Sequence, residues 1–152
     1  PEICFRIAKD IPGELNETEV IEYVDAVAAA IEIIDSRYQN FKFSLEDVVA
    51  DNCSSIGFTV GEWMPVTESL NNLNMQLRID EKTVAEGSSN DIMNNPWKSL
   101  AAATRLASQY GEPIKKGMYI MAGAATNAEF IKATQTASAK VQSLGEVSVS
   151  FK

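Results

Sequence analysis

The sequence predicts an α+β fold in which a mixed or antiparallel β-sheet dominates, accompanied by two main helices. Three observations lead to this prediction. Most apolar segments are short, and they either alternate with polar residues or form brief continuous runs, as strands do. Only two longer segments place apolar residues at helical spacing. Turn residues such as Gly, Asn, Asp and Pro separate the segments at short intervals, which is typical of strands joined by hairpins.

Short segments with apolar alternation, or with a brief apolar run, are expected to be strands. The clearest pair is Leu73–Ile79 and Thr83–Gly87, which the three residues between them predict to be a hairpin. The other expected strands are Glu2–Ala8, Ile31–Asp35, Ile56–Val60, Met118–Met121, Thr136–Val141 and Val147–Phe151.

Capping signals indicate where helices begin. Asn16 and Glu19 have the spacing of a capping box, and apolar residues follow at helical spacing, so we expect a helix over Glu17–Ala29. Ser44 can cap a short helical turn over Leu45–Ala50, whose first residues include two carboxylates that favour a helix N-terminus.

The second main helix is expected between Asn95 and Gly111. Asn95 suits the N-cap, Pro96 suits the first helical position, and Gly111 suits the C-terminal end. The chain shows no internal repeat, linker or low-complexity segment, so residues 1–152 are expected to form a single domain. No glycine-rich phosphate loop occurs.

Composition excludes several classes of function. The net charge of −8 and the pI near 4.5 argue against nucleic-acid binding, which needs clustered Lys and Arg. No apolar run approaches the roughly 18 residues that span a bilayer, so no membrane insertion is expected. Two cysteines without metal-type spacing and without a signal peptide favour a reducing compartment, and we expect the cytoplasm.

The absence of His narrows the chemistry further. Neither a Ser-His-Asp nor a Cys-His arrangement can be built from this chain alone, and a His-ligated zinc site is also excluded. Acid–base or metal chemistry would therefore depend on carboxylates, Lys, Tyr, Ser, Thr and water. A hard cation such as Mg²⁺ or Mn²⁺, held by oxygen ligands, is the remaining metal option.

Glu32 is the residue that most needs an explanation. It lies within the apolar run that predicts the strand Ile31–Asp35, and a Glu is seldom buried without a partner. Its charge could be compensated by a metal or a set of donors, it could be protonated, or it could pair with Arg37 or Lys42.

Six segments together carry a resemblance to a known family: residues 1–5, 31–37, 49–55, 111–113, 122–126 and 144–149. They resemble the fumarylacetoacetate hydrolase superfamily, and in particular its branch of 2-hydroxypentadienoate hydratases and 4-oxalocrotonate decarboxylases. They keep the family order along nearly the whole chain. Residues 35–43 are more similar to the decarboxylases than to the hydratases. The resemblance implies the mixed or antiparallel β-sheet roll of the C-terminal part of that family.

The resemblance also implies a metal site. The family motif is Glu-x-Glu on one strand with a third acidic residue on another. Glu2 matches the second Glu and Glu32 matches the third ligand, whereas the first Glu would precede Pro1. The family's N-terminal portion, with a Lys implicated in catalysis, has no counterpart in this sequence. We therefore expect the chain to be a piece of a longer protein, and its catalytic residues stay unassigned.

The reaction implied by the resemblance is decarboxylation of 2-oxo-3-hexenedioate (4-oxalocrotonate) to 2-hydroxypenta-2,4-dienoate in the meta-cleavage catabolism of aromatic compounds, through a dienolate stabilised by Mg²⁺ or Mn²⁺. The residues expected to hold substrate or water are Asp51, Asn52, Ser54, Ser55, Thr126 and Arg37. Structural roles for them stay open: turn and capping residues for the first four, a bend for Thr126 and an ion pair for Arg37.

Two other functions remain as alternatives. The first is hydration of 2-hydroxypenta-2,4-dienoate (2-oxopent-4-enoate) on the same type of metal site. The second is a non-catalytic fragment or assembly partner, because the first ligand and the N-terminal portion are missing. The expected partners are a small 2-oxo acid substrate, further copies of the chain in a homo-oligomer, and the pathway's partner hydratase or decarboxylase.

Overall fold

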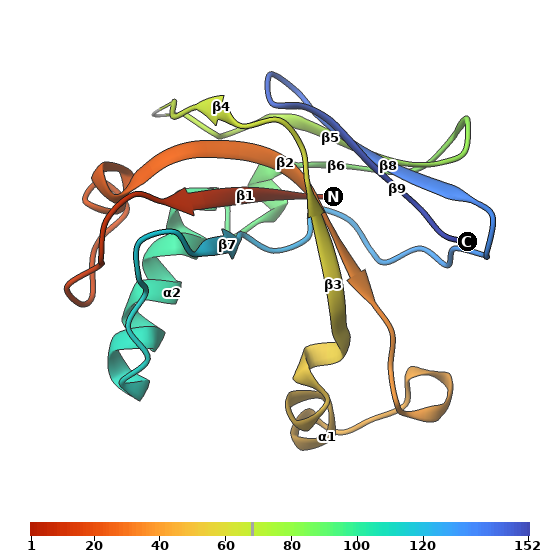
Figure 1. Cartoon of the computed structure of the whole chain (residues 1–152), viewed down its shortest axis with the longest axis horizontal. Helices are drawn as coiled ribbons and strands as arrows, with labels where there is room; N and C mark the ends of the chain where they lie inside the picture. Colours follow the sequence, from red (N-terminus) through yellow and green to blue (C-terminus); the bar gives the residue numbers. More distant parts are fainter. Residues whose placement is uncertain (68) are drawn as a thin grey trace.

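Two β-sheets form the body of the molecule in the computed structural model, which describes residues 1–67 and 69–152 (Figure 1). Every strand pair among the described residues is antiparallel. Two α-helices accompany the sheets within this part of the chain, so the α+β class with a dominant antiparallel sheet is confirmed.

The first sheet has the strand order β3-β2-β1-β7, and β4 also pairs with β2. In this sheet Glu2 lies opposite Ala30, and Glu32 lies opposite Phe58. The β1–β2 ladder ends at the first of these pairs, so the last residues of β2 pair only with β3. The strands are β1 (Glu2–Ile7), β2 (Val24–Ile34), β3 (Ser55–Val60), β4 (Met64–Pro65) and β7 (Tyr119–Met121).

The second sheet has the order β6-β5-β8-β9. Its two hairpins confirm the strands expected between residues 73 and 87 and between residues 136 and 151. Strand β2 lies against β8 and β9, and Ile31 and Val147 belong to one hydrophobic core shared by both sheets. The strands are β5 (Asn74–Ile79), β6 (Lys82–Ser88), β8 (Thr136–Val141) and β9 (Gly145–Ser150).

Helix α2 (Pro96–Tyr110) packs against the first sheet, as Figure 1 shows. The ring centroids of Phe5 and Trp97 lie 4.8 Å apart, which joins β1 to the first turn of the helix. The expected ends are confirmed: the Asn95 side chain accepts a hydrogen bond from the Trp97 N–H, and Gly111 has a φ of 70°.

Helix α1 (Leu45–Ala50) lies at the far end of the arm that β3 and the end of β2 form (Figure 1). The capping box at Ser44 confirms the sequence prediction for this turn. The remaining short elements are 3₁₀ turns: η1 (Val20–Tyr23), η2 (Gln39–Phe41), η3 (Asn52–Ser54) and η4 (Ser89–Asp91).

The prediction of a helix over Glu17–Ala29 is wrong. The cap is real, because the Asn16 side chain accepts from the Glu19 N–H and the Glu19 carboxylate accepts from the Asn16 N–H. Only the single 3₁₀ turn η1 follows it, and the chain then enters β2. The consecutive residues from Ala26 to Ile31 of β2 are all buried, so this strand is covered on both faces, and strands β8 and β9 of the second sheet lie against it. Its apolar run therefore lacks strand alternation.

Within the described residues, none of the helices combines the length and the apolar character needed to cross a bilayer.

Candidate metal and substrate site

Glu2 lies at the start of β1 and is buried, with only 3% of its surface exposed. Its Oε2 accepts a hydrogen bond of 2.8 Å from the Gly123 N–H. Burial raises the pKa of Glu2 above its usual value; the Gly123 hydrogen bond opposes this shift, and the negative charge of Glu32 adds to it. Glu2 is thus a buried carboxylate whose pKa is also raised by the negative charge of a second carboxylate nearby.

Glu32 supplies that second carboxylate from β2. The strand itself is confirmed, but the expectation of a buried Glu32 is wrong, because its side chain is exposed. Glu32 lies beyond the last β1–β2 pair, so β1 does not flank it, and its side chain is on the opposite face of the strand from the buried Ile31. The alternative ion pair with Arg37 is also not observed, because Arg37 instead pairs with Asp51.

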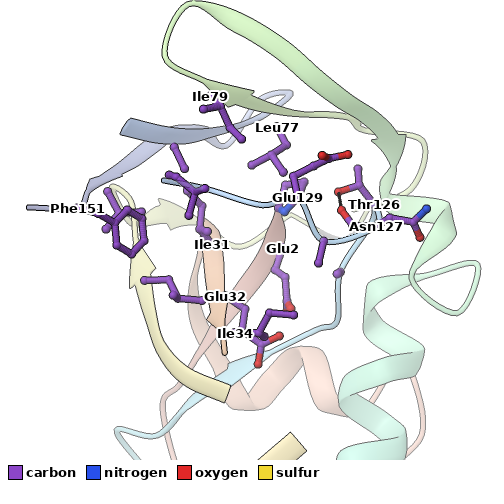
Figure 2. A pocket seen from close by; sticks show the side chains of 17 residues that line it. Glu2, Ile31, Glu32, Ile34, Leu77, Ile79, Thr126, Asn127, Glu129 and Phe151 are labelled. Carbon is purple, nitrogen blue, oxygen red and sulfur yellow. Dashed lines mark hydrogen bonds between the residues drawn. The ribbon is translucent and has the colours of Figure 1, made fainter. Parts of the chain in front are cut away.

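Glu2 and Glu32 line one pocket between the two sheets. Figure 2 shows both at one end of it, with Leu77 and Ile79 at the other. The cavity of about 170 Å³ is smaller than the roughly 300–1,000 Å³ of sites for drug-sized ligands, so it suits a small ligand. Its lining is Pro1, Glu2, Ile31, Glu32, Ile33, Ile34, Leu77, Ile79, Ala124, Thr126, Asn127, Ala128, Glu129, Ile131, Ala137, Val149 and Phe151.

The charge of this pocket favours a cation. Its described lining has three carboxylates, Glu2, Glu32 and Glu129, and includes neither Lys nor Arg. Carboxylate oxygens are the donors that Mg²⁺ and Mn²⁺ prefer, so Glu2 and Glu32 fit a divalent ion. Among the described residues, however, no three Asp, Glu, Cys or His side chains lie close enough together to hold a metal by themselves. The assignment of Glu2 and Glu32 as metal ligands therefore stays a prediction.

Thr126 is the other predicted site residue that the structure brings to this pocket. Asn127 and Glu129, from the same loop after β7, also line it and were not singled out from the sequence. This loop has no periodic pattern, and its length before β8 was the only available signal of a functional role. The Gly123 N–H was missed because no side-chain pattern reveals a backbone donor.

The remaining predicted substrate residues lie outside the pocket lining. Arg37 follows β2, and the others lie between the end of α1 and the first residue of β3: Asp51, Asn52, Ser54 and Ser55. Asp51 is buried and pairs with the exposed Arg37 guanidinium, and it also accepts a 2.9 Å hydrogen bond from the Arg37 backbone N–H. These two hydrogen bonds hold the pKa of Asp51 below its usual value. The observed contacts of both residues are therefore structural.

Asn52, Ser54 and Ser55 are the other residues of this group; the first two lie in η3, and Ser55 is the first residue of β3. Asn52 donates from its side chain to the Ser55 carbonyl oxygen at 3.1 Å. Ser54 is buried, its carbonyl oxygen accepts from the Asp35 N–H, and its hydroxyl has no hydrogen-bond partner within the described chain. Asn52 and Ser54 both have positive φ. Substrate binding by this group stays a prediction.

Comparisons with known proteins agree with this architecture. The family model described as "Fumarylacetoacetate (FAA) hydrolase C-terminal" matches residues 1–152. The chain is 45% identical over 150 residues to a 4-oxalocrotonate decarboxylase of a Pseudomonas species, covering 99% of this chain and 59% of that protein. It is 29% identical over 153 residues to a 2-keto-4-pentenoate hydratase of Paraburkholderia phymatum, covering 99% and 58%.

A solved structure is also similar. The 4-oxalocrotonate decarboxylase from Pseudomonas putida G7, complexed with magnesium and adipate, superposes with a TM-score of 0.92 at 32% identity, covering 99% of this chain and 59% of that one. The same enzyme has also been solved with calcium and acetate. The chain thus spans about three-fifths of the length of these relatives. Because the family model covers all 152 residues, the chain belongs to the fumarylacetoacetate hydrolase C-terminal family.

Proposed function

We propose that this protein takes part in the divalent-metal-dependent decarboxylation of 2-oxo-3-hexenedioate (4-oxalocrotonate) to 2-hydroxypenta-2,4-dienoate, with Glu2 and Glu32 as metal ligands. The observation that carries the proposal is the pairing of these carboxylates in one small, largely apolar pocket. The 45% identity to a decarboxylase supports the choice of reaction.

The residues of the chain have distinct roles in this proposal. Glu2 and Glu32 hold the ion, and the Gly123 N–H orients the carboxylate of Glu2. When bound, the cation supplies Lewis-acid polarisation of the 2-oxo group. The apolar wall around Leu77 and Ile79 keeps water from the substrate chain, which strengthens the electrostatic interactions inside the pocket.

Hydration of 2-hydroxypenta-2,4-dienoate is the second candidate function. The described pocket lining offers no Lys or Arg to a second substrate carboxylate, and hydratases are among the relatives. Two parallel assays on a version of the protein as long as its relatives separate the reactions. Incubation with 2-oxo-3-hexenedioate and Mg²⁺ is expected to release CO₂. Hydration of separately supplied 2-hydroxypenta-2,4-dienoate, with no CO₂ released from 2-oxo-3-hexenedioate, would replace the decarboxylase proposal.

A metal titration tests the alternative of a non-catalytic fragment or assembly partner. Mn²⁺ is expected to bind the chain, and Glu2→Gln and Glu32→Gln should each weaken this binding by tenfold or more. Equal Mn²⁺ binding by the wild type and both variants would remove these two ligands from the proposal. No binding at all would favour a non-catalytic role for the chain by itself.

The assembly and location of the protein are also proposed from the family resemblance. Mg²⁺ and Mn²⁺ are both suitable ions, because each prefers oxygen ligands. We expect a cytoplasmic homo-oligomer that associates with the partner hydratase or decarboxylase of its pathway. Light scattering of the isolated protein, and co-purification with that partner, are the measurements that check these expectations.

A further inference from the structure

We infer that Ser99, on α2, is a positioning residue that orients the carboxylate of Glu2 through the peptide between Ala122 and Gly123. The Ser99 hydroxyl donates a 2.6 Å hydrogen bond to the Ala122 carbonyl oxygen. The Gly123 N–H donates a 2.8 Å hydrogen bond to Oε2 of Glu2. The inference rests on the proposed function only in treating Glu2 as a metal ligand.

The two hydrogen bonds are made by the same peptide group, the one between Ala122 and Gly123. The Ala122 carbonyl and the Gly123 N–H belong to the same peptide group, which is planar, so fixing the direction of the carbonyl also fixes that of the N–H. A hydrogen bond accepted by the carbonyl further polarises the peptide and strengthens its N–H as a donor, by roughly 10–30% per bond. Ser99 therefore acts on Glu2 without contacting it.

The hydrogen bonds of the neighbouring residues do not fix the orientation of the peptide between Ala122 and Gly123. The flanking residues are held beside β1, because the Ala122 N–H donates to the Ile3 carbonyl at 2.9 Å and the Ala125 N–H donates to the Pro1 carbonyl at 3.1 Å. Gly123, with a φ of 109°, has no Cβ to restrict rotation of the peptide that precedes it. The Ser99 hydroxyl supplies the restraint that a side chain at Gly123 does not.

Burial makes the arrangement difficult for water to replace. Glu2 is 3% exposed and Ala122 is 5% exposed. The terminal torsion of a Glu side chain is soft, so a hydrogen bond to one oxygen is an effective way to choose its orientation. Oε2 accepts the hydrogen bond from the Gly123 N–H, whereas Oε1 keeps both of its lone pairs for an ion. Partners of metal ligands typically contribute 10–100-fold in metal affinity, and about tenfold is expected here because Ser99 acts through a peptide.

The test compares Ser99→Ala with Ser99→Thr, which keeps the hydroxyl, and with Ser108→Ala. Ser108 is an exposed serine nine residues further along α2 and serves as the matched control. In the metal-free protein, NMR should show the Gly123 amide proton moving upfield and exchanging faster in Ser99→Ala. Mn²⁺ affinity should fall about tenfold in the same variant. Ser99→Thr and Ser108→Ala should resemble the wild type in both measurements.

Each result decides the inference. Unchanged Gly123 signals and Mn²⁺ affinity in a folded Ser99→Ala variant would overturn it, as would a Ser99→Thr variant as impaired as Ser99→Ala. If Ser99→Ala does not fold by circular dichroism, Ser99→Cys replaces it, and its weaker donor should give a smaller shift in the same direction. If the wild type binds no Mn²⁺, the proposed metal site fails, and the Gly123 amide signals alone decide whether Ser99 positions Glu2.

Discussion

Glu2 and Glu32 share a pocket but differ in their exposure to water, and this difference has a measurable consequence. Because burial raises the pKa of Glu2, the folded protein binds this proton more tightly than the unfolded chain does. Stability from this group is present below the unfolded pKa, near 4.5, and is lost as the pH rises through the folded pKa. Without metal, Glu2→Gln should therefore increase the free energy of unfolding at pH 7 by roughly 1 kcal/mol.

The measurement is urea unfolding in the presence of a chelator at pH 4 and pH 7, and the gain from Glu2→Gln should shrink at the lower pH. Glu32→Gln is the matched control. Its side chain is exposed, so its effect should stay within about 0.5 kcal/mol at both pH values. A wild type more stable than Glu2→Gln at pH 7 would show that the Gly123 hydrogen bond outweighs burial.

The two cysteines should differ in reactivity. Cys4 is fully buried, and burial together with the nearby Glu2 charge raises its pKa to about 12. Cys53 is exposed. Since the thiolate is the reactive form, the folded protein should react with an aromatic disulfide reagent at one thiol at pH 8, and at two thiols after unfolding. Raising the pH to 9 should leave this number unchanged, because Cys4 stays protonated.

Cys53→Ser is the control for this assignment: it should remove the fast reaction and leave only the thiol that unfolding exposes. Rapid modification of Cys53→Ser at pH 8 would mean that the strand β1 opens readily to solvent, contrary to its position between β2 and β7.

At the scale of elements, local signals identified most strands and the helix between Asn95 and Gly111, because caps, turns and alternation are encoded within a few residues. The exception is the segment Glu17–Ala29. Its apolar run is compatible with a buried helix and with a strand buried on both faces, and only the neighbours of β2 decide between them. A valid cap at Asn16 therefore led to a wrong helix.

The candidate site was predictable only in part for the same reason. Family resemblance suggested Glu2 and Glu32, but their common pocket depends on the β1–β2 register, which no local pattern specifies. The polar residues around Asp51 were also interpreted as turn and capping residues, and their contacts agree with this role. Asn52 and Ser54 have positive φ values, and hydrogen bonds within the segment suit a tight turn. Backbone donors such as the Gly123 N–H leave no trace in a sequence.

Gly87 in β6 lies directly against Ala125 and Thr126, in the loop between β7 and β8 that lines the pocket, and this close contact predicts a loss of stability when Gly87 is replaced. A Cβ at Gly87 would overlap the Ala125 carbonyl oxygen and would lie 3.2 Å from Cγ2 of Thr126. Gly87→Ala must therefore displace the loop backbone that carries Thr126 into the pocket. We expect a loss of roughly 1–3 kcal/mol in the free energy of unfolding, measured with urea.

Gly57→Ala in β3 is the matched control, because its new Cβ would meet only Cδ1 of Ile33, at 4.0 Å. That variant should lose much less stability than Gly87→Ala. Equal losses in the two variants would mean that the general cost of changing a strand glycine, and not the close approach to Ala125, dominates.

For the whole molecule, the net charge of −8 makes divalent cations stabilising in two ways. They screen the charge of the entire surface, and in the proposed function they also bind Glu2 and Glu32 specifically. A ligand at 100 times its Kd stabilises the folded state by about 2.7 kcal/mol, which corresponds to a rise in Tm of roughly 5–10 °C for a domain of this size. Saturating Mg²⁺ should produce such a rise in a thermal unfolding scan.

A double variant, Glu2→Gln with Glu32→Gln, separates these contributions. It keeps a net charge of −6, so general screening persists, whereas specific binding is lost. Its Tm should respond to Mg²⁺ only as much as it responds to NaCl of equal ionic strength, while the wild type should respond more strongly to Mg²⁺. If Mg²⁺ raises the Tm of both proteins equally, the ion acts on the acidic surface in general, and the pocket between the two sheets is not where it binds.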